Sequence, residues 1–351
     1  MPAGRHQPLP DALEVRARHC VDLAEVARAV CDVLHTRVPY DFGCLAVTDP
    51  ATGLISWAYK SRPLLVGDEE FAAAEYGGSD INQFAEIAAR RDPVGVLSID
   101  TGGDLGSCRR FRDFLAPRFG FTDELRVVFR VRGLTWGALA LYRGPGEPAF
   151  TAEEGRTGAS VQVQIAMLIR RALFRPALPN PGSPPGPAVI IVDTEDRVTH
   201  LTPAAQTRIE DLGGWDHGSL PSPVLVTSAA ARTTSAPATN RAVGRDGAWL
   251  VVRATPFAAA MTAGTSSTRD ELVITVEGAS PSEVSALAMA ARGLSAREQE
   301  VAGLVLQGVA TKGISEALHL SPHTVQDHLK SIFSKLGVNS RREMVQKLVL
   351  R

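Results

Sequence analysis

Residues 321–337, SPHTVQDHLKSIFSKLG, have two marked ends and the periodicity of a single short helix. Ser321 is a favourable N-cap, Pro322 suits the first helical position and Gly337 suits the stop. The apolar residues recur on one stripe of such a helix, and they are Val325, Leu329, Ile332, Phe333 and Leu336. The sequence therefore predicts a helix that packs on a core and turns its polar face to water or to a partner.

Three more short helices are predicted around this one, at 294–308, 311–318 and 339–351. Capping boxes open the first and the last of them. Four such short helices can bury a core only as a compact bundle. The 311–318 helix reaches the 321–337 helix through a tight turn, and the second of the pair has the long polar face. This is the plan of a helix-turn-helix.

The motifs of residues 294–341 resemble the LuxR-type helix-turn-helix domain of bacterial transcription regulators. The matching features are the opening LSARE, Gly308, the SPHTV and HL of the predicted second helix, and KLGVNSR. The resemblance implies that the 321–337 helix enters the major groove of DNA. The candidate DNA contacts are then Thr311, Lys312, Ser321, His323, Thr324, Gln326, Asp327, Lys330, Ser331, Lys335 and Arg341.

Two departures from the family pattern affect this interpretation. Where this chain has Gln326 and Asp327, the family usually has a lysine and a residue such as asparagine, and at Gly313 it usually has glutamate. Gln326 can still read an adenine edge, while Asp327 either accepts from a cytosine amine or repels phosphates. Two interpretations stay open: tuned DNA binding, or an interaction protein whose bundle binds a protein partner with little specific DNA binding.

The distribution of charge favours the first interpretation. The whole chain has a formal charge of −1 and a pI near 6.7, so it is no general binder of polyanions. Residues 294–351 hold eight Lys and Arg against five Asp and Glu, a net charge of +3. Four of the five lysines of the chain lie there, which favours phosphate contacts. Helix surfaces also tolerate lysine, so composition alone does not decide.

A length of 351 residues predicts two or three domains. Residues 175–187, RPALPNPGSPPGP, are too rich in proline and glycine for regular structure and form a linker. A second boundary is expected at 278–293, as a linker or hinge helix. The expected domains are therefore 1–174, 188–277 and 294–351.

The pattern of residues 1–174 is similar to the GAF sensor fold. It contains a helix, a strand pair at 42–60, a loop-rich middle, a second strand pair at 123–143 and a closing helix. The resemblance implies a small-molecule pocket over the sheet, with a candidate lining of Trp57, Tyr59, Phe84 and Trp136. Ordinary core positions are an equally open interpretation for these aromatics. Helices at both ends could pack against a second copy in a dimer.

The opening of residues 188–277, AVIIVDTEDRVTHLTPAAQTRI, resembles a PAS domain. Later strands are expected in GAWLVVRATPF and ELVITVEG. The low-complexity stretch TSAAARTTSAPAT, residues 227–239, is expected to be a loop. A sensor and a structural spacer both remain open for this domain. The expected fold class is thus α+β multidomain, with GAF-like and PAS-like α/β sensor domains before a four-helix LuxR-type bundle.

Several other classes of protein lack their motifs in this sequence. There is no Walker loop, no H-E-x-x-H and no G-x-S-x-G, and the first hundred residues lack a receiver pattern, so we expect no enzyme. No apolar run has the length of a membrane helix, and the four cysteines have no metal-like spacing. His323 and His328 lie five residues apart on one helix and so do not form a metal pair. The expected location is the cytoplasm, and the cofactor is unknown.

These observations predict a one-component regulator in which the GAF-like and PAS-like domains bias a dimeric helix-turn-helix. A single recognition helix covers few base pairs, so we expect a homodimer on an inverted-repeat operator in double-stranded DNA. In LuxR-type domains the last helix is the dimer contact, which points to Met344 and Leu348 here, although both could instead only cap their own bundle. RNA polymerase is a further candidate partner, and the small-molecule effector is unknown.

Overall fold

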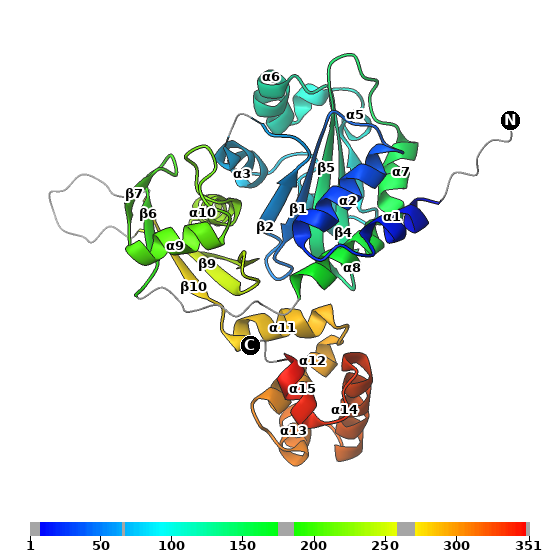
Figure 1. Cartoon of the computed structure of the whole chain (residues 1–351), viewed down its shortest axis with the longest axis vertical. Coiled ribbons are helices and arrows are strands. Elements are labelled where there is room, and N and C mark those ends of the chain that lie inside the picture. The colour runs from blue at the N-terminus through cyan, green and yellow to red at the C-terminus, as the bar shows by residue number, and fades with distance from the viewer. Residues whose placement is uncertain (1–7, 65–66, 175–185, 258–270, 349–351) are drawn as a thin grey trace. The chain divides into compact units, whose positions relative to one another are not determined.

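The computed structural model describes residues 8–64, 67–174, 186–257 and 271–348 (Figure 1). The chain divides into two compact units, residues 1–278 and 279–351. Most of the predicted linker at 175–187 lies outside the described residues.

The first half of the first unit is built on a five-stranded antiparallel sheet with the strand order β2-β1-β5-β4-β3. Arg132 and Gly133 have positive φ angles of 54° and 79° in the two-residue turn between β4 and β5, as a tight hairpin of this kind requires. The strands are β1 (Phe42–Thr48), β2 (Ile55–Lys60), β3 (Val94–Val96), β4 (Asp123–Val131) and β5 (Leu134–Arg143).

Helices cover this sheet. The second and the last helix of this half pack against each other and against the sheet, and the first helix packs on the second. The sequence of helix, hairpin, irregular middle, hairpin and closing helix agrees with the predicted GAF-like order. The helices are α1 (Leu9–Ala17), α2 (Leu23–His35), α3 (Asp68–Tyr76), α4 (Phe84–Ala89), α5 (Leu97–Asp100), η1 (Leu105–Ser107), η2 (Phe111–Leu115), α6 (Ala116–Phe119), α7 (Ala152–Ser160) and α8 (Gln162–Leu173).

The second half of the first unit has its own five-stranded antiparallel sheet, with the order β7-β6-β10-β9-β8. When the strands are counted within each half, both sheets run second, first, fifth, fourth, third. The two halves therefore share one sheet connectivity. The elements are β6 (Val189–Val192), β7 (Val198–Leu201), α9 (Pro203–Asp211), α10 (Ser222–Thr234), β8 (Ala238–Val243), β9 (Trp249–Pro256) and β10 (Leu272–Gly278).

The loop predicted at 227–239 is wrong, because most of it belongs to α10 and its last two residues begin β8. Its run of Ala, Thr and Ser has no amphipathic period because the helix is buried on several sides, and its residues from Pro223 to Ala229 are all buried. Alanine favours a helix and allows close packing. The hydroxyls of Thr227 and Ser228 donate to carbonyls four residues back, which satisfies them inside the core.

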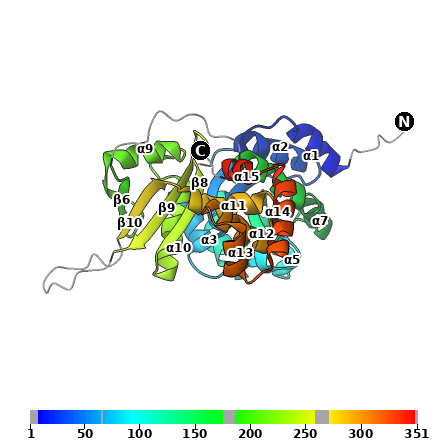
Figure 2. The same cartoon turned by 90° about the horizontal axis from the view of Figure 1, so that it is seen from below.

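The two halves of the first unit share contacts. Helix α10 packs on α3 and β2, as Figure 2 also shows for α3 and α10. Asn240 is fully buried and donates to the carbonyl of Ile55 at 2.9 Å, and Arg241 lies 3.0 Å from Asp49. These buried polar contacts hold β2 and the β1–β2 turn against the second sheet.

The second unit contains five helices in its described residues: the four of the predicted bundle and one in the segment predicted as a linker or hinge helix. Residues 281–291 form a helix that opens with a capping box of Ser280 and Glu283, and Met289 and Leu294 join the core of the bundle. The predicted hinge thus belongs to the bundle rather than to a linker. The helices are α11 (Pro281–Ala291), α12 (Ala296–Leu306), α13 (Thr311–Leu318), α14 (Pro322–Leu336) and α15 (Arg341–Leu348).

Candidate nucleic-acid interface and sensor cavity

Helix α14 begins and ends where the sequence predicts. The Ser321 hydroxyl accepts from the backbone N–H of Thr324 at 3.0 Å, and Gly337 ends the helix with a left-handed φ of 61°. Val325, Leu329, Ile332 and Leu336 are buried in the bundle core. The position of this stripe leaves the opposite face of α14 exposed.

A tight turn joins α13 to α14. His319 has a positive φ of 51° just after α13, and the Leu320 N–H donates to the Ser315 carbonyl at 3.0 Å. The Ser315 hydroxyl donates to the Leu320 carbonyl, which closes the turn from the other side. The two helices therefore have the connection of a helix-turn-helix.

The exposed face of α14 carries a short row of polar side chains. The side chains of His323, Asp327 and Lys330 are 86%, 54% and 77% exposed. The Asp327 carboxylate lies between the other two, with one oxygen 3.1 Å from Nδ1 of His323 and the other 3.6 Å from Nζ of Lys330. Exposed pairs of this kind contribute about 0–1 kcal/mol, so a DNA group can displace them.

The remaining candidates near this row differ in exposure. Gln326 lies exposed beside Asp327, and Lys312 is exposed in the first turn of α13. Thr311 and Thr324 are half-buried. The hydroxyls of Ser321 and Thr324 lie 2.8 Å apart and bond to each other, so their first role is in the N-terminal cap of α14.

Three predicted DNA contacts are engaged inside the unit instead. Ser331 donates to Glu298 at 2.6 Å, and Lys335 donates to both carboxylate oxygens of Glu298. Arg341 donates to the carbonyl of Val309 at 3.3 Å. We therefore remove these three residues from the candidate set, because their polar atoms hold helices and loops of the bundle together.

Sequence reasoning missed the second role of Glu298. Its backbone N–H donates to the Ser295 hydroxyl, as the capping box predicts, but its buried carboxylate also faces α14. Burial opposes ionisation, yet the hydrogen bonds from Lys335 and Ser331 lower the pKa of Glu298 to about 2. The contact joins residues 33 and 37 positions apart, and no local sequence pattern reports it.

The predicted dimer contact is wrong as to its residues. Met344 is 0% exposed and Leu348 is 1% exposed, and both lie in the core of their own bundle. Val345 also packs against that core. The exposed positions of α15 are charged or polar, and they are Arg342, Glu343, Gln346 and Lys347.

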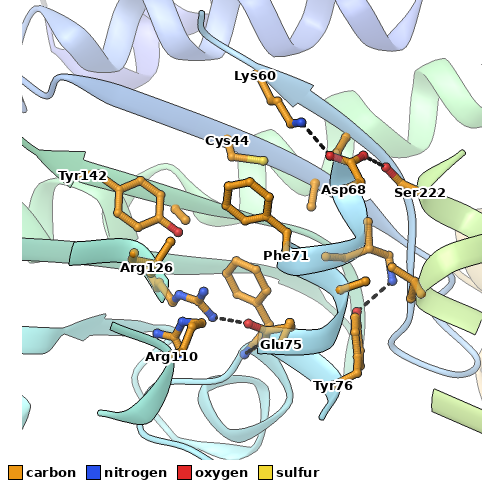
Figure 3. Close-up of a pocket in the computed structure, with 18 of the residues that line it drawn as sticks. Cys44, Lys60, Asp68, Phe71, Glu75, Tyr76, Arg110, Arg126, Tyr142 and Ser222 are labelled. Carbon is orange, nitrogen blue, oxygen red and sulfur yellow. Dashed lines mark hydrogen bonds and ion pairs between the residues drawn. The ribbon is translucent and has the colours of Figure 1, made fainter. Parts of the chain in front are cut away.

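The first unit contains a cavity of about 70 Å³ between α3 and the β1, β2 and β5 strands (Figure 3). Of the four predicted lining residues, Phe84 alone lines it. Trp57 lines a separate open depression with Leu173, and Trp136 is buried against Phe174 and Arg170. Tyr59 is half-buried elsewhere. The prediction is therefore wrong for Trp57, Tyr59 and Trp136. Trp57 and Tyr59 alternate along β2 with the lining residues Ala58 and Lys60, so they lie on the other face of the sheet, and Trp136 lies at an irregularity in the pairing of β4 with β5.

Two buried arginines that the sequence did not single out lie at one end of the cavity. Arg126 lies 2.6 Å from Glu75 of α3, and its guanidinium stacks over Phe84. Arg110 lies 2.5 Å from Glu124. Isolated charges are costly to bury, and here each charge has an opposite partner.

Two properties of the described residues concern membranes and metal ions. No helix among them is long and apolar enough to cross a membrane. No group of three or more His, Cys, Asp or Glu side chains in the part of the chain that the structure describes could hold a metal ion.

Residues 292–348 match the family model of bacterial regulatory proteins of the luxR family. The spore germination protein GerE of Bacillus subtilis is 39% identical over 56 residues, which are 16% of this chain and 76% of that protein. The chain belongs to the LuxR family. The monoamine regulon transcriptional regulator of Klebsiella aerogenes is 41% identical over 54 residues, covering 15% of this chain and 24% of that protein.

Two other comparisons match only part of this LuxR-family chain. An HTH-type transcriptional regulator of Mycobacterium tuberculosis is 36% identical over 88 residues, covering 21% of this chain and 10% of that protein. The chain thus spans about a tenth of the length of this relative. The GAF domain/HD domain protein from Geobacter sulfurreducens is 16% identical with a TM-score of 0.32, covering 44% of this chain and 95% of that chain.

Proposed function

We propose that this LuxR-family protein is a one-component transcriptional regulator that binds double-stranded DNA sequence-specifically through α14. The observation that carries the proposal is the exposed face of α14, where Gln326 and Lys330 stand free of the core opposite a fully buried stripe. Helix α14 follows α13 through a tight turn, as the recognition helix does in a helix-turn-helix.

The exposed groups match DNA chemically. Gln326 can make two hydrogen bonds to an adenine edge, and Lys330 can donate to a guanine or a phosphate. Lys312 on α13 is exposed and would contact the DNA backbone. Asp327 tunes this face, because in the free protein it pairs with Lys330 and His323, and on DNA it can accept from a cytosine amine.

The same proposal includes a homodimer on an inverted-repeat operator, because one recognition helix covers too few base pairs for a specific site. Since α15 keeps its apolar side chains in its own core, we place the dimer contact on the first unit. There Val163 and Met167 are exposed one turn apart on α8, and Val15 is exposed on α1. Gln164 of α8 donates to the Pro10 carbonyl of α1, so the two helices lie together.

The first unit would act as the sensor, with a small-molecule effector shifting the balance between DNA-binding and non-binding arrangements. RNA polymerase is a further candidate partner of such a regulator.

Fluorescence anisotropy with DNA from the protein's own promoter region, over a salt series, tests the DNA proposal. We expect specific binding that weakens linearly with the logarithm of salt concentration, because phosphate contacts release counterions. Unlabelled random DNA of equal length is the matched competitor. Equal competition by random and promoter DNA would leave the alternative, a bundle that binds a protein partner with little specific DNA binding.

A further inference from the structure

Helix α3 forms one wall of the cavity and also packs against the second half of the unit. Asp68, Phe71 and Glu75 of α3 line the cavity. Ala72 packs in the hydrophobic core of the second half. Any outward movement of α3 must therefore press on the second half.

Two hydrogen bonds tie α3 to α10. The Ser222 hydroxyl of α10 donates to Asp68, which also pairs with Lys60 of β2 at 2.5 Å (Figure 3). At the other end of α3, the Thr233 hydroxyl donates to the Tyr76 carbonyl at 2.6 Å. Ser222 itself lines the cavity, so the second half contributes to the wall.

The cavity has a mostly apolar lining that includes a buried hydroxyl without a hydrogen-bond partner in the part of the chain that the structure describes. Its apolar lining includes Phe42, Ala46, Phe71, Phe84, Leu115 and Ala140. The Tyr142 side chain also lines it, is 2% exposed, and its hydroxyl has no hydrogen-bond partner among the described residues. Burial raises the pKa of Tyr142, so the hydroxyl stays protonated and can donate.

The charges around the cavity indicate a neutral ligand. Each charged side chain in the lining has an opposite partner: Lys60 pairs with Asp68, Arg126 with Glu75, and Arg110 with Glu124. Burial raises the pKa of the Cys44 thiol to about 12, so this lining residue is also neutral. An ionised ligand would have no unpaired counter-charge and would pay for its desolvation.

The size of the cavity links binding to movement. At about 70 Å³ it is smaller than the roughly 150 Å³ apolar cavity that admits benzene. A ring-sized ligand therefore enters only if part of the wall moves outward. Helix α3 is such a wall, and α10 packs against it.

We propose that the cavity binds a small neutral molecule with an apolar body and one oxygen that accepts a hydrogen bond from Tyr142. Entry of this molecule displaces α3. The displacement is transmitted to α10 through the Asp68–Ser222 and Thr233–Tyr76 hydrogen bonds. The ligand class and the coupling follow from the first unit alone. Their effect on transcription rests on the proposed function.

Binding is tested with phenol and with benzene, which lacks the oxygen, on the full chain by ligand-observed NMR titration. Tyr142→Phe keeps the ring and removes the donor. We expect phenol to bind about threefold to tenfold more weakly to Tyr142→Phe, the usual effect of one neutral hydrogen bond, and benzene to bind equally to both proteins. Equal phenol affinities for the two proteins would overturn the assignment of Tyr142.

Coupling is tested by amide hydrogen exchange of α3 and α10 at saturating phenol. We expect exchange to change in both helices in the wild-type chain. In Ser222→Ala the change in α10 should shrink relative to that in α3. Arg241→Ala removes an interdomain contact that does not line the cavity, and it should keep the wild-type pattern. A change confined to α3 in the wild type would overturn the coupling.

Leu115→Ala provides the decisive variant, because Leu115 is fully buried and enters the cavity from η2 rather than from α3. The enlarged cavity should take phenol more tightly while α10 responds less, since α3 no longer has to move. If this variant does not fold, Leu115→Val tests the same direction. Absence of phenol and benzene binding in both the wild type and the enlarged cavity would overturn the site. Promoter DNA binding by the ligand-free chain, measured in parallel, reports separately on the proposed function.

Discussion

The Nζ atom of Lys335 lies 2.7 Å from one carboxylate oxygen of Glu298 and 2.6 Å from the other. This contact joins α12 to the last turn of α14, and Ser331 adds a third hydrogen bond one turn earlier. The orientation of the candidate recognition helix in its bundle therefore depends on one buried carboxylate.

We expect the stability of residues 279–351 to fall in acid as Glu298 is protonated. Its folded pKa of about 2 lies below the ordinary value of 4.5, so the ionised form stabilises the folded unit. This contribution is fully present above about pH 4.5 and is lost as the pH falls toward 2; the difference in pKa corresponds to at most about 3 kcal/mol. Urea unfolding followed by circular dichroism across this range measures it.

Glu298→Gln should remove most of that pH dependence and lower stability at neutral pH. Glu300→Gln is the matched control on the same helix, because Glu300 is exposed and pairs only with nearby Arg297. If the free energy of unfolding depends on pH in the same way for the wild type and Glu298→Gln, this carboxylate does not cause the loss of stability in acid.

Lys330→Ala should weaken promoter binding by about 1–3 kcal/mol if Lys330 reads a guanine, and should reduce the salt slope by about 1 if it meets a phosphate. Lys347→Ala is the control, because Lys347 is exposed on α15, away from the face of α14. Anisotropy titrations at several salt concentrations separate the two roles. Unchanged affinity and unchanged slope together would exclude Lys330 from the interface.

Asp327→Asn should raise affinity for random DNA, because it removes a negative charge from the exposed face and releases His323 and Lys330. The ratio of promoter to random affinity should fall if Asp327 accepts from a cytosine amine. Folding stability should change by less than about 0.5 kcal/mol, as for other exposed positions. Competition titrations with both DNAs give the ratio, and weaker binding to random DNA would contradict the repulsion argument.

Met344→Ala should destabilise the bundle by about 2–5 kcal/mol, because it empties a fully buried core position. Gln346→Ala, two residues on and exposed, should leave the stability nearly unchanged. Thermal melts of both variants measure the difference. A folded Met344→Ala variant of wild-type stability would show that Met344 does not stabilise the core and could act as a surface contact.

Met167→Lys should weaken association of the full chain, because it places a charge on the exposed apolar face of α8. Ile99→Lys is the control, since Ile99 is a comparably exposed apolar residue on α5. Sedimentation equilibrium compares the dissociation constants. An equal effect of the two substitutions would argue against α8 as the dimer surface.

The sequence determined much of the second unit, because helix caps, stops and apolar stripes act over a few neighbouring residues. Ser321, Gly337 and the stripe beginning at Val325 lie as predicted, and the motifs of 294–341 identified the family. The strand pairs of the first unit followed from alternating apolar residues and turn chemistry in the same way.

The tertiary structure alone decided which polar side chains of the second unit remain available for contact with DNA. Lys335 and Ser331 have the polar character of DNA contacts, but Glu298 holds them through a contact between distant parts of the chain. A strand pattern also does not say which way a bulged segment turns its side chains, so the sequence could not decide on which face of the sheet Trp136 lies. The sequence also failed to predict helix α10, because a helix buried on several sides has no amphipathic period. Its packing against α3 is seen only in the tertiary structure.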